Sequence, residues 1–118
     1  MNYLDTYALI EIGLDNPNYR STREEDFRVC DVTLAEFHFV NLREGKKDAE
    51  EWTMKIRPHS EPTSLDWMIE AVEFRAAHRS LNLSFPDVVG YIHARKNNGV
   101  FVTGDKAFEK LPHVKYVK

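Results

Sequence analysis

The sequence is poor in cysteine and has no long apolar run. Cys30 is the single cysteine among 118 residues, which excludes an intrachain disulfide and a cysteine-rich zinc site and fits a reducing cytoplasm. No stretch approaches the ~20 apolar residues that cross a bilayer, and the N-terminus lacks a basic region followed by an apolar segment. We therefore expect a soluble, cytoplasmic protein with no membrane partner.

An excess of basic residues is also lacking, because the formal net charge is −3. A nucleic-acid partner would therefore have to be held by a local basic patch and by bound cations. The length of 118 residues and the 42% share of hydrophobic residues suit one compact domain and leave no room for a second. We expect residues 1–118 to form a single domain.

Strand-like and helix-like patterns alternate along the chain. Strands are predicted over 2–5, 27–31, 100–103 and 114–117, with a weak edge strand within 56–60, where Pro58 is unfavourable. Helices are predicted over 7–12, 33–43, 46–55, 65–80, 84–96 and 106–110, and residues 14–24 are predicted to be a surface loop with one helical turn. This order predicts an α/β fold, a three-layer α/β/α sandwich with a mainly parallel sheet.

Four carboxylates fall at corresponding places in these elements. Asp5 and Asp105 follow apolar strands, the second within the run Gly99-Val-Phe-Val-Thr-Gly-Asp105, while Glu36 and Asp87 lie at the starts of helices. In an open α/β sheet, the carboxyl ends of strands and the N-termini of the following helices meet in one crevice. We therefore expect these four acids to share one small volume.

Each acid taken alone has a structural explanation. Asp5 and Asp105 could cap the helices that follow them, Glu36 could complete a capping box with Thr33, and Asp87 could do the same with Ser84. Capping does not, however, require all four acids to lie on the same edge of the sheet. That shared placement is what favours a functional site.

A cluster of carboxylates is stabilised by a cation or by protons. Oxygen ligands without nearby histidine or cysteine favour hard ions such as Mg²⁺ or Mn²⁺, and such an ion supports phosphodiester hydrolysis. Thr6 and Thr103 lie beside the acids and offer hydroxyls that can hold a carboxylate, a water or a phosphate oxygen. The sequence thus predicts a site made of four acids and two threonines.

The joint pattern resembles the PIN domain family, and within it the VapC-type toxin ribonucleases of toxin–antitoxin pairs. The resemblance rests on four segments that occur in order over nearly the whole chain: Asp5-Thr6, Thr33-Leu-Ala-Glu36, Phe85-Pro-Asp87 and Val102-Thr-Gly-Asp105-Lys-Ala-Phe108. Two features depart from the family, since the chain is short for it and residues 14–24 match nothing in its pattern. Neither departure touches the acids.

The resemblance implies a Mg²⁺- or Mn²⁺-dependent endoribonuclease acting on RNA. It implies that Asp5, Asp87 and Asp105 contact the metal directly, that Glu36 binds through water or helps to activate it, and that Thr6 and Thr103 are its hydroxyl positions. It also implies a homodimer and an antitoxin protein whose tail enters the acidic groove. A PIN nuclease of RNA processing or decay, and an inactive PIN fold serving as a binding module, are the alternatives.

Two other enzyme classes fit less well. A phosphoacceptor signalling domain needs an aspartate at the end of its middle strand, and the third of the five predicted strands in chain order reads Arg57-Pro-His-Ser60 there. Aspartate-based phosphatases need a second acid where Tyr7 stands. Six basic residues could line a phosphate-binding rim or simply form solvated helix faces: Arg43, Lys46, Lys47, Arg95, Lys96 and Lys106.

Overall fold

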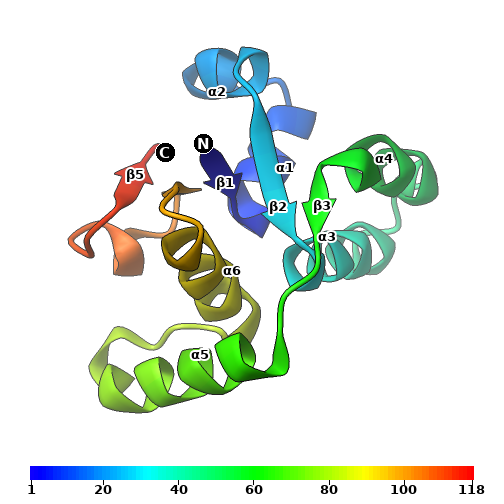
Figure 1. Cartoon of the computed structure of the whole chain (residues 1–118). Helices are drawn as coiled ribbons and strands as arrows, with labels where there is room; N and C mark the ends of the chain where they lie inside the picture. Colours follow the sequence, from blue (N-terminus) through cyan, green and yellow to red (C-terminus); the bar gives the residue numbers. More distant parts are fainter.

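A five-stranded parallel sheet forms the centre of the molecule (Figure 1). The computed structural model describes all residues, 1–118. The strands are β1 (Asn2–Leu4), β2 (Phe27–Cys30), β3 (Ser60–Glu61), β4 (Val100–Thr103) and β5 (Val114–Tyr116). Their order across the sheet is β3-β2-β1-β4-β5, and every neighbouring pair is parallel. The predicted parallel α/β sheet is therefore confirmed.

Helices connect the strands and cover both faces of the sheet. The α-helices are α1 (Thr6–Gly13), α2 (Arg20–Glu24), α3 (Asp31–Arg43), α4 (Ala49–Ile56), α5 (Leu65–Ala77) and α6 (Phe85–Lys96). Short 3-10 helices are η1 (Pro17–Tyr19), η2 (Arg57–His59), η3 (Arg79–Leu81) and η4 (Lys106–Phe108). None of these helices combines the length and the apolarity needed to span a bilayer.

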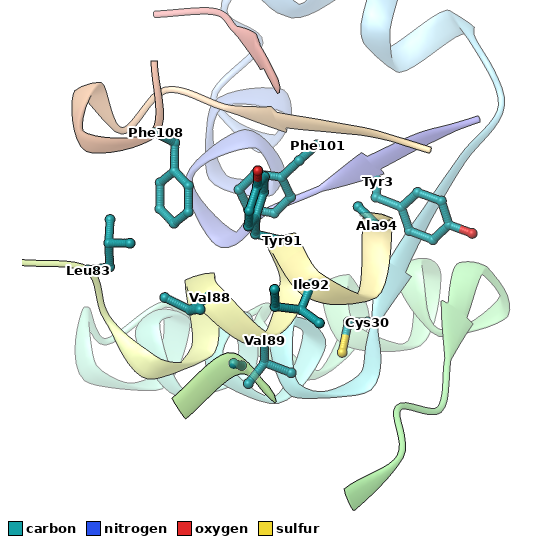
Figure 2. Close-up of a cluster of buried hydrophobic side chains, with 11 residues drawn as sticks. Tyr3, Cys30, Leu83, Val88, Val89, Tyr91, Ile92, Ala94, Phe101 and Phe108 are labelled. Atoms are coloured by element: carbon teal, nitrogen blue, oxygen red, sulfur yellow. The ribbon is translucent and has the colours of Figure 1, made fainter. Parts of the chain in front are cut away.

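Alternation along the strands creates two hydrophobic cores. Tyr3 of β1 and Phe101 of β4 face the core beneath α6 and α5, whereas Leu4 and Val102, the next residues in each strand, face the core beneath α1 and α3. Figure 2 shows Tyr91 of α6 lying among the side chains of the first core. A sheet with a filled core on each face is the predicted three-layer sandwich.

The structure corrects four local predictions. The helix expected from residue 33 begins at Asp31, whose charge suits a helix N-terminus, directly after β2. Residues 14–24 contain η1 and α2 and are not only a loop, because Tyr19 and Thr22 are buried there. The helix expected from residue 46 starts at Ala49, and the weak edge strand shrinks to Ser60–Glu61, since the preceding residues form η2.

In the turn between α6 and β4, one residue takes the left-handed conformation and the next one must be small. Asn98, and not Gly99, takes the left-handed conformation, with φ at 55°. Position 99 has room only for glycine, because a Cβ there would lie 2.5 Å from ring atoms of Tyr3 and 2.9 Å from the carbonyl oxygen of Met1. This close approach lets the start of β4 lie directly against β1.

We expect Gly99→Ala to lower the free energy of unfolding by about 1–3 kcal/mol, as overpacking of a core commonly does. Gly13→Ala is the matched control, because its Cβ would meet only Trp52, at an ordinary 3.8 Å. Urea denaturation of both variants checks this. Equal stability of the two variants would contradict the steric argument.

Candidate functional site

Asp5 is the buried centre of the site. It follows β1, begins α1 and is only 1% exposed. Its Oδ1 accepts a hydrogen bond of 2.8 Å from the backbone N–H of Ala8, and its Oδ2 accepts one from the hydroxyl of Thr103 on β4. Because β1 and β4 are neighbours in the sheet, these bonds hold the carboxylate at the shared carboxyl edge.

Thr103 also links Asp5 to Asp105. Its hydroxyl, which donates to Asp5, accepts a hydrogen bond of 3.0 Å from the backbone N–H of Asp105. The Asp105 carboxylate in turn accepts from the backbone N–H of Ala107, at 3.0 Å, in the first turn of η4. One buried hydroxyl therefore connects the ends of both strands.

Glu36 and Asp87 come from two helices that cross closely. Glu36 of α3 accepts a hydrogen bond of 2.5 Å from the hydroxyl of Thr6 at the start of α1. Gly90 of α6 lies against α3, since a Cβ at Gly90 would be only 3.0 Å from the hydroxyl oxygen of Thr33. Each acid lies one helical turn from this crossing, so the crossing brings Glu36 and Asp87 together.

The four acids are close enough for their charges to interact. Burial raises the pKa of Asp5 to about 8, and the charges of Asp87 and Asp105 add to this, while the bonds from Thr103 and Ala8 oppose it. Burial, followed by the charge of Glu36, raises the pKa of Asp87 to about 6, although the Ser84 hydroxyl opposes this rise. None of the four acids forms an ion pair with a basic side chain.

The capping explanation is correct for two acids and wrong for one. Asp5 and Asp105 do cap α1 and η4, so each has a structural duty in addition to its place in the cluster. Glu36 does not complete a capping box with Thr33, because α3 has already begun at Asp31 and its N-cap is Cys30. Ser84 caps α6 by accepting from the backbone N–H of Asp87, at 3.3 Å.

The donor set fits a hard divalent cation in its chemistry. Four carboxylates with two hydroxyls offer only oxygen, and a cation would offset both the desolvation by burial and the repulsion that raise the pKa values of Asp5 and Asp87. In the positions that the side chains take, no group of three or more Asp, Glu, His or Cys side chains is placed to hold an ion. Ligation by three acids would therefore require side-chain rotation.

Histidine does not contribute to this site. His93 follows Asp87 by six residues on α6, which is less than two helical turns. It is 2% exposed, and its Nε2 lies 3.0 Å from Glu61 Oε1 of β3. His93 is therefore a buried structural residue.

Two glycines were missed as residues that shape the site. Gly90 permits the helix crossing described above, and Gly104 makes room for Tyr7, whose ring atoms would lie 2.0–2.5 Å from a Cβ at that position. The ring of Tyr7 thereby covers the Thr103–Asp105 turn. A glycine in the middle of an apolar helix was the available signal for Gly90.

We expect the stability advantage of Asp87→Asn over the wild type to grow as pH rises from 4 to 7 in metal-free buffer. The folded pKa of about 6 exceeds the ordinary value of 3.8, so the folded wild type binds the extra proton and loses stability as that proton leaves. The change is on the order of 1–3 kcal/mol. Denaturation at several pH values measures it.

Asp66→Asn controls for the loss of one negative charge, because Asp66 is exposed on α5 and forms no ion pair. The same pH dependence in both variants would contradict the assignment to Asp87.

Solved structures with the same fold include three from toxin–antitoxin systems. A toxin–antitoxin complex from Klebsiella pneumoniae superposes with a TM-score of 0.77 at 18% identity, covering 98% of this chain and 96% of that one. VapC20 from Mycobacterium tuberculosis, a sarcin-ricin loop cleaving toxin, has a TM-score of 0.72 at 18% identity over 83% and 84% of the two chains. VapBC2 from Rickettsia felis, bound to a DNA fragment from its promoter, has a TM-score of 0.73 at 20% identity over 100% of both chains.

These superpositions, at 20% identity or less, show a shared fold. No curated protein sequence matches the chain. A family model described as the PIN domain does match, over residues 3–114, which includes all of β1 but its first residue, the four acids and the first residue of β5. The parallel sheet, the order of its helices and this match together show that the chain belongs to the PIN domain family.

Proposed function

We propose that residues 1–118 act as one PIN domain, a Mg²⁺- or Mn²⁺-dependent endoribonuclease of the cytoplasm and the toxin of a VapBC-type pair. The observation that carries the proposal is the gathering of Asp5, Glu36, Asp87 and Asp105 at one sheet edge with no basic side chain to neutralise them. Crowded carboxylates lower stability unless they serve a cation. The toxins and toxin–antitoxin complexes among the structural neighbours support the same assignment.

Each residue of the site has a role in this proposal. Asp5, Asp87 and Asp105 would hold the ion, which supplies polarisation of the phosphoryl oxygen and eases deprotonation of the attacking water. Thr103 orients Asp5 through its hydroxyl, and Thr6 orients Glu36 by occupying one of its oxygens. The second oxygen of Glu36 is then free to accept a proton from water as the phosphodiester bond breaks.

Two alternatives share the same fold. A PIN nuclease of RNA processing would use the same acids, so an antitoxin gene beside the toxin gene is the distinguishing observation. An inactive PIN fold used for binding would have no need of the complete set of four acids. The toxin assignment includes an antitoxin protein as partner, and toxin–antitoxin assemblies are among the structural neighbours.

A homodimer is the proposed assembly. Leu65, Ile69 and Val72 are exposed by 68%, 48% and 52% and recur at helical spacing along one face of α5. Contiguous exposed apolar side chains of this kind mark protein interfaces more often than isolated ones do. The second copy of the chain is the proposed occupant of this face.

Purified, antitoxin-free protein is expected to cleave a mixed RNA pool with Mg²⁺ or Mn²⁺ and to be inactive with EDTA. Asp87→Asn should lower cleavage by about 100-fold or more, because even residues that merely orient metal ligands are worth about 10–100-fold. Gel analysis of the products measures both effects, with Asp66→Asn as the matched control. Cleavage that persists in EDTA or in Asp87→Asn would overturn the proposal.

Ile69→Lys is expected to shift the protein from dimer to monomer, because a charge in the centre of the α5 face opposes its burial. Sedimentation velocity over a range of concentrations measures the shift. Met54→Lys is the control, since Met54 is 58% exposed on α4. A wild type that stays monomeric, or equal behaviour of the two variants, would exclude dimerisation through α5.

A further inference from the structure

A basic hollow lies where α5 ends and the chain turns toward α6. Its volume is about 460 Å³, and it is formed by the last turns of α5, by η3 and by the loop that follows. No acidic side chain lines it. The lining residues are Val72, Arg75, Ala76, Arg79, Asn82 and Leu83. Val72 is also the last residue of the proposed dimer face on α5, so the hollow begins where that face ends and its arginines follow it along the chain.

The two arginines of the hollow carry uncompensated charge. Arg75 donates from Nε to the carbonyl oxygen of Leu83, at 2.7 Å, which fixes the guanidinium and leaves its terminal nitrogens free of ion pairs. Arg79 is exposed and forms no ion pair either. Arg75 belongs to α5 and Arg79 to η3, and two guanidinium groups that line one hollow offer the planar donor geometry that suits a phosphate.

Three basic residues that the sequence analysis considered for a phosphate rim are engaged elsewhere. Lys96 pairs with Glu70 at 3.0 Å, and Arg43 lies 3.7 Å from Glu44. Arg95 lies over the ring of Tyr91, with its guanidinium carbon 5.8 Å from the ring centroid. Arg75 and Arg79 are therefore better placed than these three to bind an external anion.

The hollow is close to the acidic cluster along the chain. Leu83 lies directly before Ser84, the N-cap of α6, and Asp87 follows Leu83 by four residues. Even a fully extended chain of that length spans at most about 14 Å. An RNA strand lying across the acids could therefore reach the hollow within a few nucleotides.

We propose that the hollow formed by Arg75, Arg79 and Asn82 binds a backbone phosphate of the RNA strand that is cleaved at the acidic cluster. The proposal rests on the nuclease function proposed above and adds a binding position outside the acids. A chain with net charge −3 needs such a local patch, because the acids themselves repel the RNA backbone. The amide of Asn82 adds a neutral donor at the same hollow.

The test measures RNA binding without cleavage. A fluorescein-labelled single-stranded RNA is titrated with the full chain in EDTA, and fluorescence anisotropy gives Kd at several salt concentrations. Arg79→Gln should weaken binding several-fold and lower the slope of log Kd against log salt by about 0.7, the value of one lost phosphate contact on a single strand. Arg75→Lys keeps the charge but removes the Nε donor, so it should weaken binding with little change in slope.

Arg20→Gln is the matched control, because Arg20 is also an exposed arginine without an ion pair and belongs to α2, away from α5 (Figure 1). Equal slopes for Arg79→Gln and Arg20→Gln would overturn the proposal, as would a wild type that does not bind RNA in EDTA. If Arg79→Gln changed the sedimentation coefficient but not the slope of log Kd against log salt, that would also overturn the proposal and would assign the hollow to a protein contact. The cleavage assay with Mg²⁺ separates these outcomes from failure of the nuclease function.

Discussion

The burial of Asp5 among other carboxylates is the constraint on which the site depends. Its side chain is almost completely excluded from water, and the charges of Asp87 and Asp105 act on it in addition to the cost of desolvation. Two hydrogen bonds, from Ala8 and Thr103, compensate only in part, since the pKa is still raised to about 8. A site in this state favours whatever brings positive charge to it, whether a proton or a cation.

The surrounding fold maintains this constraint through close backbone contacts. Gly90 allows α6 to approach α3, and Gly104 allows Tyr7 to cover the turn that ends in Asp105. A larger side chain at either glycine would push apart elements that carry an acid. The parallel pairing of β1 with β4 then brings Asp5 and Thr103 to the same edge of the sheet.

The acidic cluster and the basic hollow are alike in lacking ion pairs. The acids form no ion pairs, whereas several basic residues of the helices are paired locally, as Lys96 is with Glu70. Arg75 and Arg79 are exceptions that lie next to the segment leading into α6. An acidic centre beside an unpaired basic hollow is an arrangement in which a cation and a polyanion could be bound together.

Local patterns in the sequence were enough to predict the α/β architecture and the positions of the acids at strand ends and helix starts. Strand alternation and helix spacing are local properties, and an acid that follows a parallel strand must lie at the carboxyl edge. Local signals failed at Thr33, where the spacing of a capping box occurs inside a helix. They also failed at residues 14–24, where turn-forming residues predicted a loop but η1 and α2 form and Tyr19 is buried.

The hydrogen-bond partners of each acid depend on how the chain packs and could not be predicted from local patterns. The bonds of Thr6 to Glu36 and of Thr103 to Asp5 join residues 30 and 98 positions apart, and no periodicity reports contacts at such separations. The raised pKa values and the basic hollow depend in the same way on burial and on which charges remain unpaired. These are properties of the packed chain, because desolvation and charge pairing exist only once distant segments meet.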